Sequence, residues 1–373
     1  MPERTRLVDL VNARLEAFLD ERAGQLEAVA PDLEVFTDAA RDLLRGGKRF
    51  RALFCYWGWH AVAGTVRADD LLAELDTHTD LPSVIEAAAA LEIFHAAALV
   101  HDDIMDNSDT RRGMPAAHRR FEADHARREW TGSARTYGTA TALLLGDLLL
   151  GWSDELLDAG LSRLSDPRSA RAARGEFQTM RTEVTVGQYL DILEEVAWRD
   201  ADEADLLPRA HRVVTYKSAK YSIEAPLALG GLMAGGSLEQ VAALRAFGLP
   251  LGVAFQLRDD LLGVFGDPAI TGKPAGDDLR EGKRTVIIAL ARAALPAGAV
   301  ALIDELLGDP DLSEHQIATL QATIRDSGAV ETTERIIERS VQEALAALED
   351  APLSRSARAE LVGLSDLVTR RAH

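Results

Sequence analysis

The amino-acid sequence predicts an all-α fold, a single large helical bundle with a central cavity between two aspartate-bearing helices. Helical periodicity runs through the 373 residues, and no run of alternating apolar and polar residues indicates a strand. Two helices, 84–105 and 247–264, are apolar nearly all round, as buried helices are. Both end in acidic side chains, which are seldom buried without a partner or a metal.

The spacing of apolar residues predicts twelve helices, at about 5–29, 36–45, 49–63, 82–106, 137–160, 171–193, 205–222, 239–264, 284–294, 313–326, 329–349 and 353–371. Gly and Pro stand between these segments, for example at Pro31 and at Gly235-Gly236. Pro82 stands in a first turn, where its missing N–H costs nothing. No Pro-rich or low-complexity linker divides the chain. We therefore expect one domain over residues 1–373, with a motif-bearing core at about 40–290.

The composition excludes several classes of protein. Hydrophobic residues make up 47 % of the chain, enough for a sizeable core. The net charge of −19 argues against nucleic acid as a partner and against docking on an anionic membrane. A single cysteine, Cys55, permits no internal disulfide and favours a reducing cytoplasm. The start has no apolar signal segment, and the most apolar stretches carry charges such as Glu86 and Asp147, so we expect no membrane span.

An acidic cluster, DDxxD, ends the first apolar helix. Asp102 and Asp106 are four residues apart and share one face, while Asp103 points about 100° away. Like charges at this spacing destabilise an isolated helix. They make sense if they bind Mg²⁺, which prefers carboxylate oxygens and is often shared with substrate phosphates. Taken alone, the pattern is weak evidence and is more often a solvated acidic helix end.

A second acidic cluster lies on the other apolar helix. Gln256, Asp259 and Asp260 are spaced to border one cavity. Two acidic helix ends that face each other would bind a polyanion through several metal ions. Metal ions alone would leave part of the charge unbalanced, so cationic side chains should accompany them.

Cationic side chains occur at four further places. Any one of them, taken alone, could be an ordinary surface cation. Lys48 and Arg51 lie at a glycine-preceded helix start, where backbone N–H groups and the helix dipole favour anions. The other three places are Arg111-Arg112, Lys217 beside Ser218, and the pair Lys273 and Lys283. Arg can bind phosphate oxygens in a fork, and Lys acts as a point charge.

Five segments in this order resemble the trans-isoprenyl diphosphate synthase (polyprenyl synthetase) family, and most of all its geranylgeranyl diphosphate synthases. They are GGKRFR, HAAALVHDDIMDNSDTRRG, YKSAKY, FQLRDDLLGVFGD and GKPAGDDLREGKRT, between about residues 40 and 290. The resemblance implies the isoprenoid synthase fold and a homodimer. It also implies head-to-tail condensation of isopentenyl diphosphate with an allylic diphosphate, and about three Mg²⁺ ions in the active site.

The resemblance assigns roles residue by residue. It places Lys48, Arg51, His95 and Arg112 on isopentenyl diphosphate, and Asp102, Asp106, Asp259 and Asp260 on magnesium. It places Arg111, Lys217, Ser218, Gln256, Lys273 and Lys283 on the allylic diphosphate, with Lys217, Ser218 and Gln256 also stabilising the carbocation. Ser218 stands where Thr is commoner and keeps the hydroxyl. Gly263 stands where the second motif usually has its third aspartate, which puts that site's metal count in doubt.

Product length is expected to depend on the helix before Asp102. Counted back at 100° per residue, Ala98, Phe94 and Leu91 fall on one flank of the metal face and His95 on the other. Ala97 and Ala98 are too small to block a growing chain, so Phe94 becomes the floor. This predicts a product of geranylgeranyl length, with a longer chain or farnesyl diphosphate as alternatives. The alanines could instead serve only close helix packing.

Three other functions remain possible from the sequence. A class I terpene cyclase also ionises allylic diphosphates with DDxxD, but it normally lacks the GGKRFR segment and carries a different second metal motif. A non-catalytic partner subunit would be expected to have lost an acidic or basic motif. A purely structural scaffold leaves the paired carboxylates unexplained. Products formed from isopentenyl diphosphate, allylic primers and Mg²⁺ distinguish all three.

Overall fold

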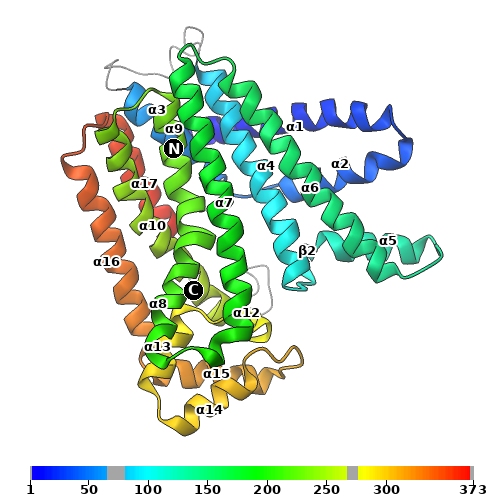
Figure 1. Cartoon of the computed structure of the whole chain (residues 1–373), viewed down its shortest axis with the longest axis vertical. Coiled ribbons are helices and arrows are strands. Elements are labelled where there is room, and N and C mark those ends of the chain that lie inside the picture. The colour runs from blue at the N-terminus through cyan, green and yellow to red at the C-terminus, as the bar shows by residue number, and fades with distance from the viewer. Residues whose placement is uncertain (1, 65–79, 267–275, 370–373) are drawn as a thin grey trace. The chain divides into compact units, whose positions relative to one another are not determined.

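A computed structural model describes residues 2–64, 80–266 and 276–369. The chain divides into two compact units, Met1–Gly175 with Pro226–Ser237, and Glu176–Ala225 with Leu238–His373. Helices form almost all the regular structure in both units, which confirms the all-α class (Figure 1). The single domain and the cavity between the two aspartate-bearing helices stay predictions, because these helices belong to different units.

The first unit is built around a pair of long helices, α4 (Leu81–Met105) and α6 (Ala134–Leu161), which run side by side (Figure 1). Around them lie α1 (Pro2–Glu27), η1 (Pro31–Leu33), α2 (Glu34–Leu44), α3 (Phe50–Ala63), α5 (Ala117–Arg127), the first part of α7 (Pro167–Ala197) and α9 (Ala225–Met233). Residues Thr110–Arg111 (β1) and Met114–Pro115 (β2) form a small antiparallel hairpin. Pro82 lies in the first turn of α4, as predicted.

The acidic residues inside the apolar helix α4 are paired with arginines from other segments. Glu86 is buried, and its two carboxylate oxygens accept hydrogen bonds from Arg14 Nε (2.7 Å) and Arg163 Nη1 (3.3 Å). Paired and hydrogen-bonded carboxylates avoid the cost of an isolated buried charge. The acids inside α4 therefore fix neighbouring segments against it.

The second unit has α10 (Leu238–Phe265) at its core, beside α16 (Ala329–Glu349) (Figure 1). Its other elements are the remainder of α7, η2 (Trp198–Asp200), α8 (Glu203–Val213), η3 (Val214–Glu224), α12 (Asp277–Glu281), α13 (Val286–Ala294), α14 (Ala297–Leu306), α15 (Glu314–Asp326) and α17 (Arg355–Thr369). Leu257, Leu261 and Val264 of α10 are buried against Ile287 and Ile337 of the surrounding helices. This core holds the acidic end of α10 in place.

The element η3 is a π-helix of 11 residues, which contains YKSAKY. Such stretches are rare and often lie at functional sites. A Cβ atom on Gly187 of α7 would overlap the backbone of Tyr216 and Lys217, and one on Gly252 of α10 would overlap that of Ala219. The two glycines therefore let α7 and α10 approach η3 closely.

Most predicted helices are confirmed within a few residues, but four were missed. In α5 charged residues hide a narrow buried stripe of Ala117, Phe121 and His125. The other three are short: α9 has nine residues, α12 five and α14 ten. The helix expected at 205–222 is in fact α8 followed by the π-helix, because apolar spacing does not distinguish the two windings.

Two described helices, α4 and α10, are long and apolar enough to cross a membrane by length and composition. The sequence analysis underestimated the length of the apolar stretch in both helices. In the most apolar window of α4, 78 % is buried inside the structure, and in that of α10, 44 %. Core helices of folded units pass the same test, and the absence of a membrane span stays a prediction.

Candidate active site

The segment GGKRFR joins α2 to α3, and its cationic side chains differ in how far they are buried. Gly46 and Gly47 have φ of 73° and 87°, a conformation that glycine adopts without strain. Lys48 is exposed and Arg51 half-buried, whereas Arg49 is only 6 % exposed and forms an ion pair with Glu92. Arg49 therefore has a structural role that the sequence did not reveal, and the two cations predicted to bind substrate are the more accessible ones.

The β1–β2 hairpin brings Arg112 to the same segment. Arg112 has a positive φ of 54°, and its Nη1 donates a hydrogen bond to the carbonyl of Leu43 (3.2 Å). A Cβ atom on Gly47 would lie 3.5 Å from the Arg112 guanidinium nitrogens. Sequence reasoning grouped Arg112 with Lys48 and Arg51, and the structure places it beside their loop.

His95 lies on α4 within the field of these arginines. Burial lowers the pKa of His95 well below its usual value, and the positive charges of Arg51, Arg112, Arg111 and Arg49 lower it further. The imidazole is therefore neutral at neutral pH. A neutral ring among four guanidinium groups adds no charge but offers a hydrogen-bonding nitrogen. This cluster of Arg51, His95 and Arg112 is suited to an anion of high charge.

Two of the aspartates at the end of α4, Asp102 and Asp103, are bound to Arg111. Its Nε donates to Asp103 Oδ1 (2.8 Å) and its Nη2 to Asp102 Oδ2 (3.2 Å). Asp103 is fully buried, whereas Asp102 and Asp106 are partly exposed. The helical spacing predicted that Asp103 lies on a different face from Asp102 and Asp106. Asp103 fixes the guanidinium, and Asp102 and Asp106 are left on the accessible side.

In the second unit, Asp191 of α7 joins the two predicted lysines. Lys217 Nζ lies 2.5 Å and Lys283 Nζ 3.1 Å from Asp191 Oδ2, and Lys283 also contacts Glu195 Oε1 at 3.0 Å. Burial alone would raise the pKa of Asp191, but the two ammonium groups hold it below its usual value. Sequence reasoning missed Asp191. The usable signal was an acidic residue within the apolar segment YLDIL, with a second acid, Glu195, four residues later and so on the same helix face.

Gln256 and Asp260 form a pair on α10. Gln256 Nε2 donates to Asp260 Oδ1 at 2.7 Å, which leaves the amide oxygen of Gln256 available. Asp260 is 5 % exposed, and burial raises its pKa well above the usual value. The hydrogen bond from Gln256 opposes this rise, and the charges of Asp278, Asp259 and Asp191 add to it. Among the described residues, Asp260 Oδ2 has no hydrogen-bond partner.

These carboxylates fit a magnesium ion by the chemistry of their donors. Asp102 and Asp106 offer accessible oxygens, and Asp260 has an oxygen that a cation would satisfy. Within the described ranges no group of three or more His, Cys, Asp or Glu side chains is arranged to hold a metal ion by itself. Mg²⁺ commonly takes one or two protein carboxylates and completes its shell with phosphate oxygens and water. Lys273 lies outside the described residues, and Ser218 is buried within η3.

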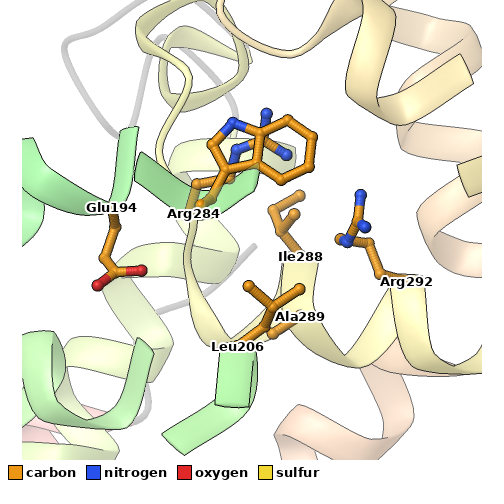
Figure 2. Close-up of a pocket in the computed structure, with 7 residues that line it drawn as sticks. Glu194, Leu206, Arg284, Ile288, Ala289 and Arg292 are labelled. Atoms are coloured by element: carbon orange, nitrogen blue, oxygen red, sulfur yellow. The ribbon is translucent and has the colours of Figure 1, made fainter. Parts of the chain in front are cut away.

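A small pocket in the second unit lies around Trp198 and is not part of the predicted site (Figure 2). Figure 2 shows Arg284 and Arg292 with Ile288 between them. The Arg284 guanidinium lies 3.7 Å from the Trp198 ring centroid, and both arginines pair with Asp304. Burial lowers the pKa of Arg284 to about 10, although Asp304 opposes the shift. The contacts of Arg284 and Arg292 with Trp198 and Asp304 therefore hold the start of α13, which follows directly after Lys283.

The residues of α4 that are predicted to control product length differ in how far they are buried. Phe94 and Leu91 are buried in α4, whereas Ala98, one turn before Asp102, keeps partial exposure. Ala97 is 0 % exposed and points about 100° away from Ala98. Of the two alanines, Ala98 is therefore the one placed to meet a chain that extends from the aspartates.

Comparison with known proteins decides the family. Residues 33–324 match the polyprenyl synthetase family. The chain belongs to this family. It is 32 % identical to a geranylfarnesyl diphosphate synthase of Aeropyrum pernix, over 86 % of this chain and 88 % of the relative. It is 30 % identical to a geranylgeranyl diphosphate synthase of Mycobacterium tuberculosis, over 87 % and 80 % of the two chains.

A solved structure gives the same result for this polyprenyl synthetase. The geranylgeranyl pyrophosphate synthase of Corynebacterium glutamicum, complexed with isoprenyl diphosphate and magnesium, is 39 % identical, with a TM-score of 0.89. The match covers 98 % of this chain and 99 % of that one. The predictions of family, isoprenoid synthase fold and trans-prenyltransferase activity are thereby confirmed. The role of each site residue stays a prediction.

Proposed function

We propose that this trans-prenyltransferase condenses isopentenyl diphosphate with allylic diphosphates to an all-E prenyl diphosphate, mainly geranylgeranyl diphosphate. The observation that supports the proposal most is the arrangement at the end of α4. There Arg111 bridges Asp102 and Asp103, and Arg51, His95 and Arg112 lie within the same electrostatic field. Carboxylates suited to a divalent cation and guanidinium groups suited to phosphates therefore occur together.

Each substrate has its own set of residues in this proposal. Lys48, Arg51, His95 and Arg112 bind isopentenyl diphosphate and hold its double bond for attack. Arg111, Lys217 and Lys283 bind the allylic diphosphate. Asp191, which joins both lysines, positions them before substrate arrives. Cationic groups fixed in advance stabilise the charge that develops on a departing diphosphate without further reorganisation.

The remaining steps need no side-chain nucleophile. The allylic carbon becomes a carbocation, and the hydroxyl of Ser218 and the free amide oxygen of Gln256 are the polar groups proposed to stabilise it. The double bond of isopentenyl diphosphate forms the new carbon–carbon bond, and loss of a proton to the released diphosphate completes the reaction. Cys55 takes no part, because burial raises the pKa of its thiol to about 12.

Magnesium is part of the proposal, with about three ions in each active site. Asp102 and Asp106 would hold ions in the first unit, and Asp259 and Asp260 in the second. When bound, the metal supplies positive charge to the diphosphate. The family is magnesium-dependent, and the Corynebacterium glutamicum relative was crystallised with magnesium. We also propose that the protein is a homodimer and is located in the cytoplasm.

The test uses purified protein, Mg²⁺, isopentenyl diphosphate and one of three primers, dimethylallyl, geranyl or farnesyl diphosphate. Mass spectrometry of dephosphorylated products should show geranylgeraniol as the main alcohol with each primer. Cyclic hydrocarbons formed without consumption of isopentenyl diphosphate would instead indicate a terpene cyclase. Absence of any product with all three primers would contradict the proposal.

A second candidate product is geranylfarnesyl diphosphate. The Aeropyrum pernix relative bears that name at 32 % identity, and Ala98 leaves the flank of Asp102 open. The same mass spectra distinguish the two, because geranylfarnesol would replace geranylgeraniol as the main alcohol at excess isopentenyl diphosphate.

A further inference from the structure

The second aspartate motif has Gly263 at its third position, and a different carboxylate fills the space there. A Cβ atom built on Gly263 would lie 2.8 Å from Asp278 Oδ1 and still closer to Oδ2. No side chain larger than hydrogen fits at residue 263 unless Asp278 moves. The Asp278 carboxylate thus lies against α10 where an aspartate at 263 would begin.

The backbone of α12 fixes Asp278 in this position. Gly276 and Gly282, with φ of 70° and 79°, turn the chain at the two ends of α12. Leu279 is buried in the core that includes Leu261 and Val264 of α10, and its carbonyl accepts a hydrogen bond from Gly308 N at 2.9 Å. Because its neighbour is anchored, Asp278 is held by the fold and not by a loose loop.

Asp260 gives an independent indication that a cation belongs at this place. It is 95 % buried, its Oδ1 accepts from Gln256, and its Oδ2 has no hydrogen-bond partner among the described residues. Asp259 and Asp278 are among the carboxylates whose charge acts on Asp260. A buried carboxylate such as Asp260 is stabilised when it coordinates a metal.

We propose that Asp278 supplies the third carboxylate of the second magnesium site, in place of the aspartate that Gly263 lacks. The inference rests on the proposed function, since it assigns a ligand to the magnesium of that site. It answers the doubt that Gly263 raised about the metal count. In this assignment one carboxylate of the site comes from α12 instead of α10.

Metal binding tests the proposal without any measurement of turnover. Mn²⁺, which favours the same oxygen ligands as Mg²⁺, is titrated into the full-length protein with and without inorganic pyrophosphate, and free Mn²⁺ is followed by electron paramagnetic resonance. Asp278→Ala should weaken the pyrophosphate-dependent binding by about 10-fold or more. Gly263→Ala should do the same, because its methyl group displaces the Asp278 carboxylate. Asp277→Ala, one residue away on α12, is the control and should change binding less than about twofold.

An exchange of positions makes the test sharper. The double variant Gly263→Asp/Asp278→Ala moves the carboxylate onto α10 after the space has been cleared, and it should recover binding to within about threefold of wild type. Thermal unfolding of each variant shows that it is folded. Wild-type affinity in Asp278→Ala, or a double variant as weak as Asp278→Ala, would overturn the inference. If the wild-type protein itself binds no Mn²⁺ with pyrophosphate, the proposed magnesium-dependent function fails as well.

Discussion

Arg49 and Glu92 form a buried ion pair that joins the start of α3 to the middle of α4. Arg49 Nη1 lies 3.3 Å from Glu92 Oε2, and each side chain is 5 % exposed. The other oxygen of Glu92 accepts a hydrogen bond from the backbone N–H of Ala52 at 3.2 Å. The pair therefore fixes the helix start that presents Arg51, and holds it against the helix that bears His95.

Replacement of Arg49 should cost stability. Arg49→Ala leaves the Glu92 carboxylate buried without its cation, which typically costs about 3–5 kcal/mol. Urea denaturation followed by circular dichroism measures the loss. Arg45→Ala, an exposed arginine in the same connection, is the control and should change the unfolding free energy by less than about 0.5 kcal/mol. Removing both charges in Arg49→Met/Glu92→Leu should restore much of the loss. Equal stability of Arg49→Ala and Arg45→Ala would refute the role of the pair.

The two cationic groups of the first unit should act on different substrates. Arg51→Ala should raise the Michaelis constant for isopentenyl diphosphate, and Arg111→Ala that for the allylic diphosphate, each by about 10-fold or more, since a charge-assisted hydrogen bond is lost. Both constants are measured in both variants. If each variant weakens both substrates equally, the division between them is wrong.

Loss of Asp102 should affect turnover far more than folding. Asp102→Ala removes a carboxylate that is partly exposed and one of two that bind Arg111, while Asp103 still holds the guanidinium. We expect turnover to fall by about 100-fold or more, with an unchanged thermal midpoint. Asp109→Ala is the matched control, because that carboxylate is exposed and Arg119 keeps Glu122 as a partner. Near-normal turnover of Asp102→Ala at saturating Mg²⁺ would exclude an essential role.

The sequence predicted those parts of the fold that depend on local patterns. The apolar periodicity of α4 and α10 predicted two buried helices, and the DDxxD spacing predicted that Asp102 and Asp103 lie on different faces. The sequence could not show that Arg49 is structural and Arg51 accessible, because the burial of each arginine depends on how closely α4 approaches the start of α3. Asp191 and Asp278 were missed for a similar reason. Each acts on residues far away in the chain, Lys217 and Lys283 for the first and Gly263 for the second.

The neutral state of His95 should make stability depend on pH. Burial and four arginines lower its pKa in the folded protein, so between pH 7.5 and 5.5 the unfolded chain takes up a proton at His95 and the folded chain does not. The unfolded state then binds more protons, and stability falls as the pH falls below about 6.5. For one such group the loss over this range is about 1.4 kcal/mol. Other histidines contribute too, so the comparison is with His95→Gln, whose unfolding free energy should fall by that much less. An identical pH dependence in both proteins would contradict the assignment.

Product length should respond to the flank of α4 that leads away from Asp102. Ala98 lies one turn before Asp102 and is partly exposed, and Phe94 lies about 12 Å before it along the axis and is buried. Ala98→Phe should block a growing chain early and shorten the main product, whereas Phe94→Ala should open the floor and lengthen it. Both variants should keep turnover within about 10-fold of wild type, because neither residue belongs to the set assigned to the diphosphates.

Mass spectrometry of the product alcohols at excess isopentenyl diphosphate measures both shifts. Ala123→Phe adds the same ring at an exposed position of α5 and should leave the product distribution unchanged. The opposite directions of the two expected shifts separate a true length stop from general damage, since damage would shorten the products of both variants. If Ala98→Phe and Phe94→Ala both return the wild-type product, the small residues of α4 serve helix packing, and another helix sets the length.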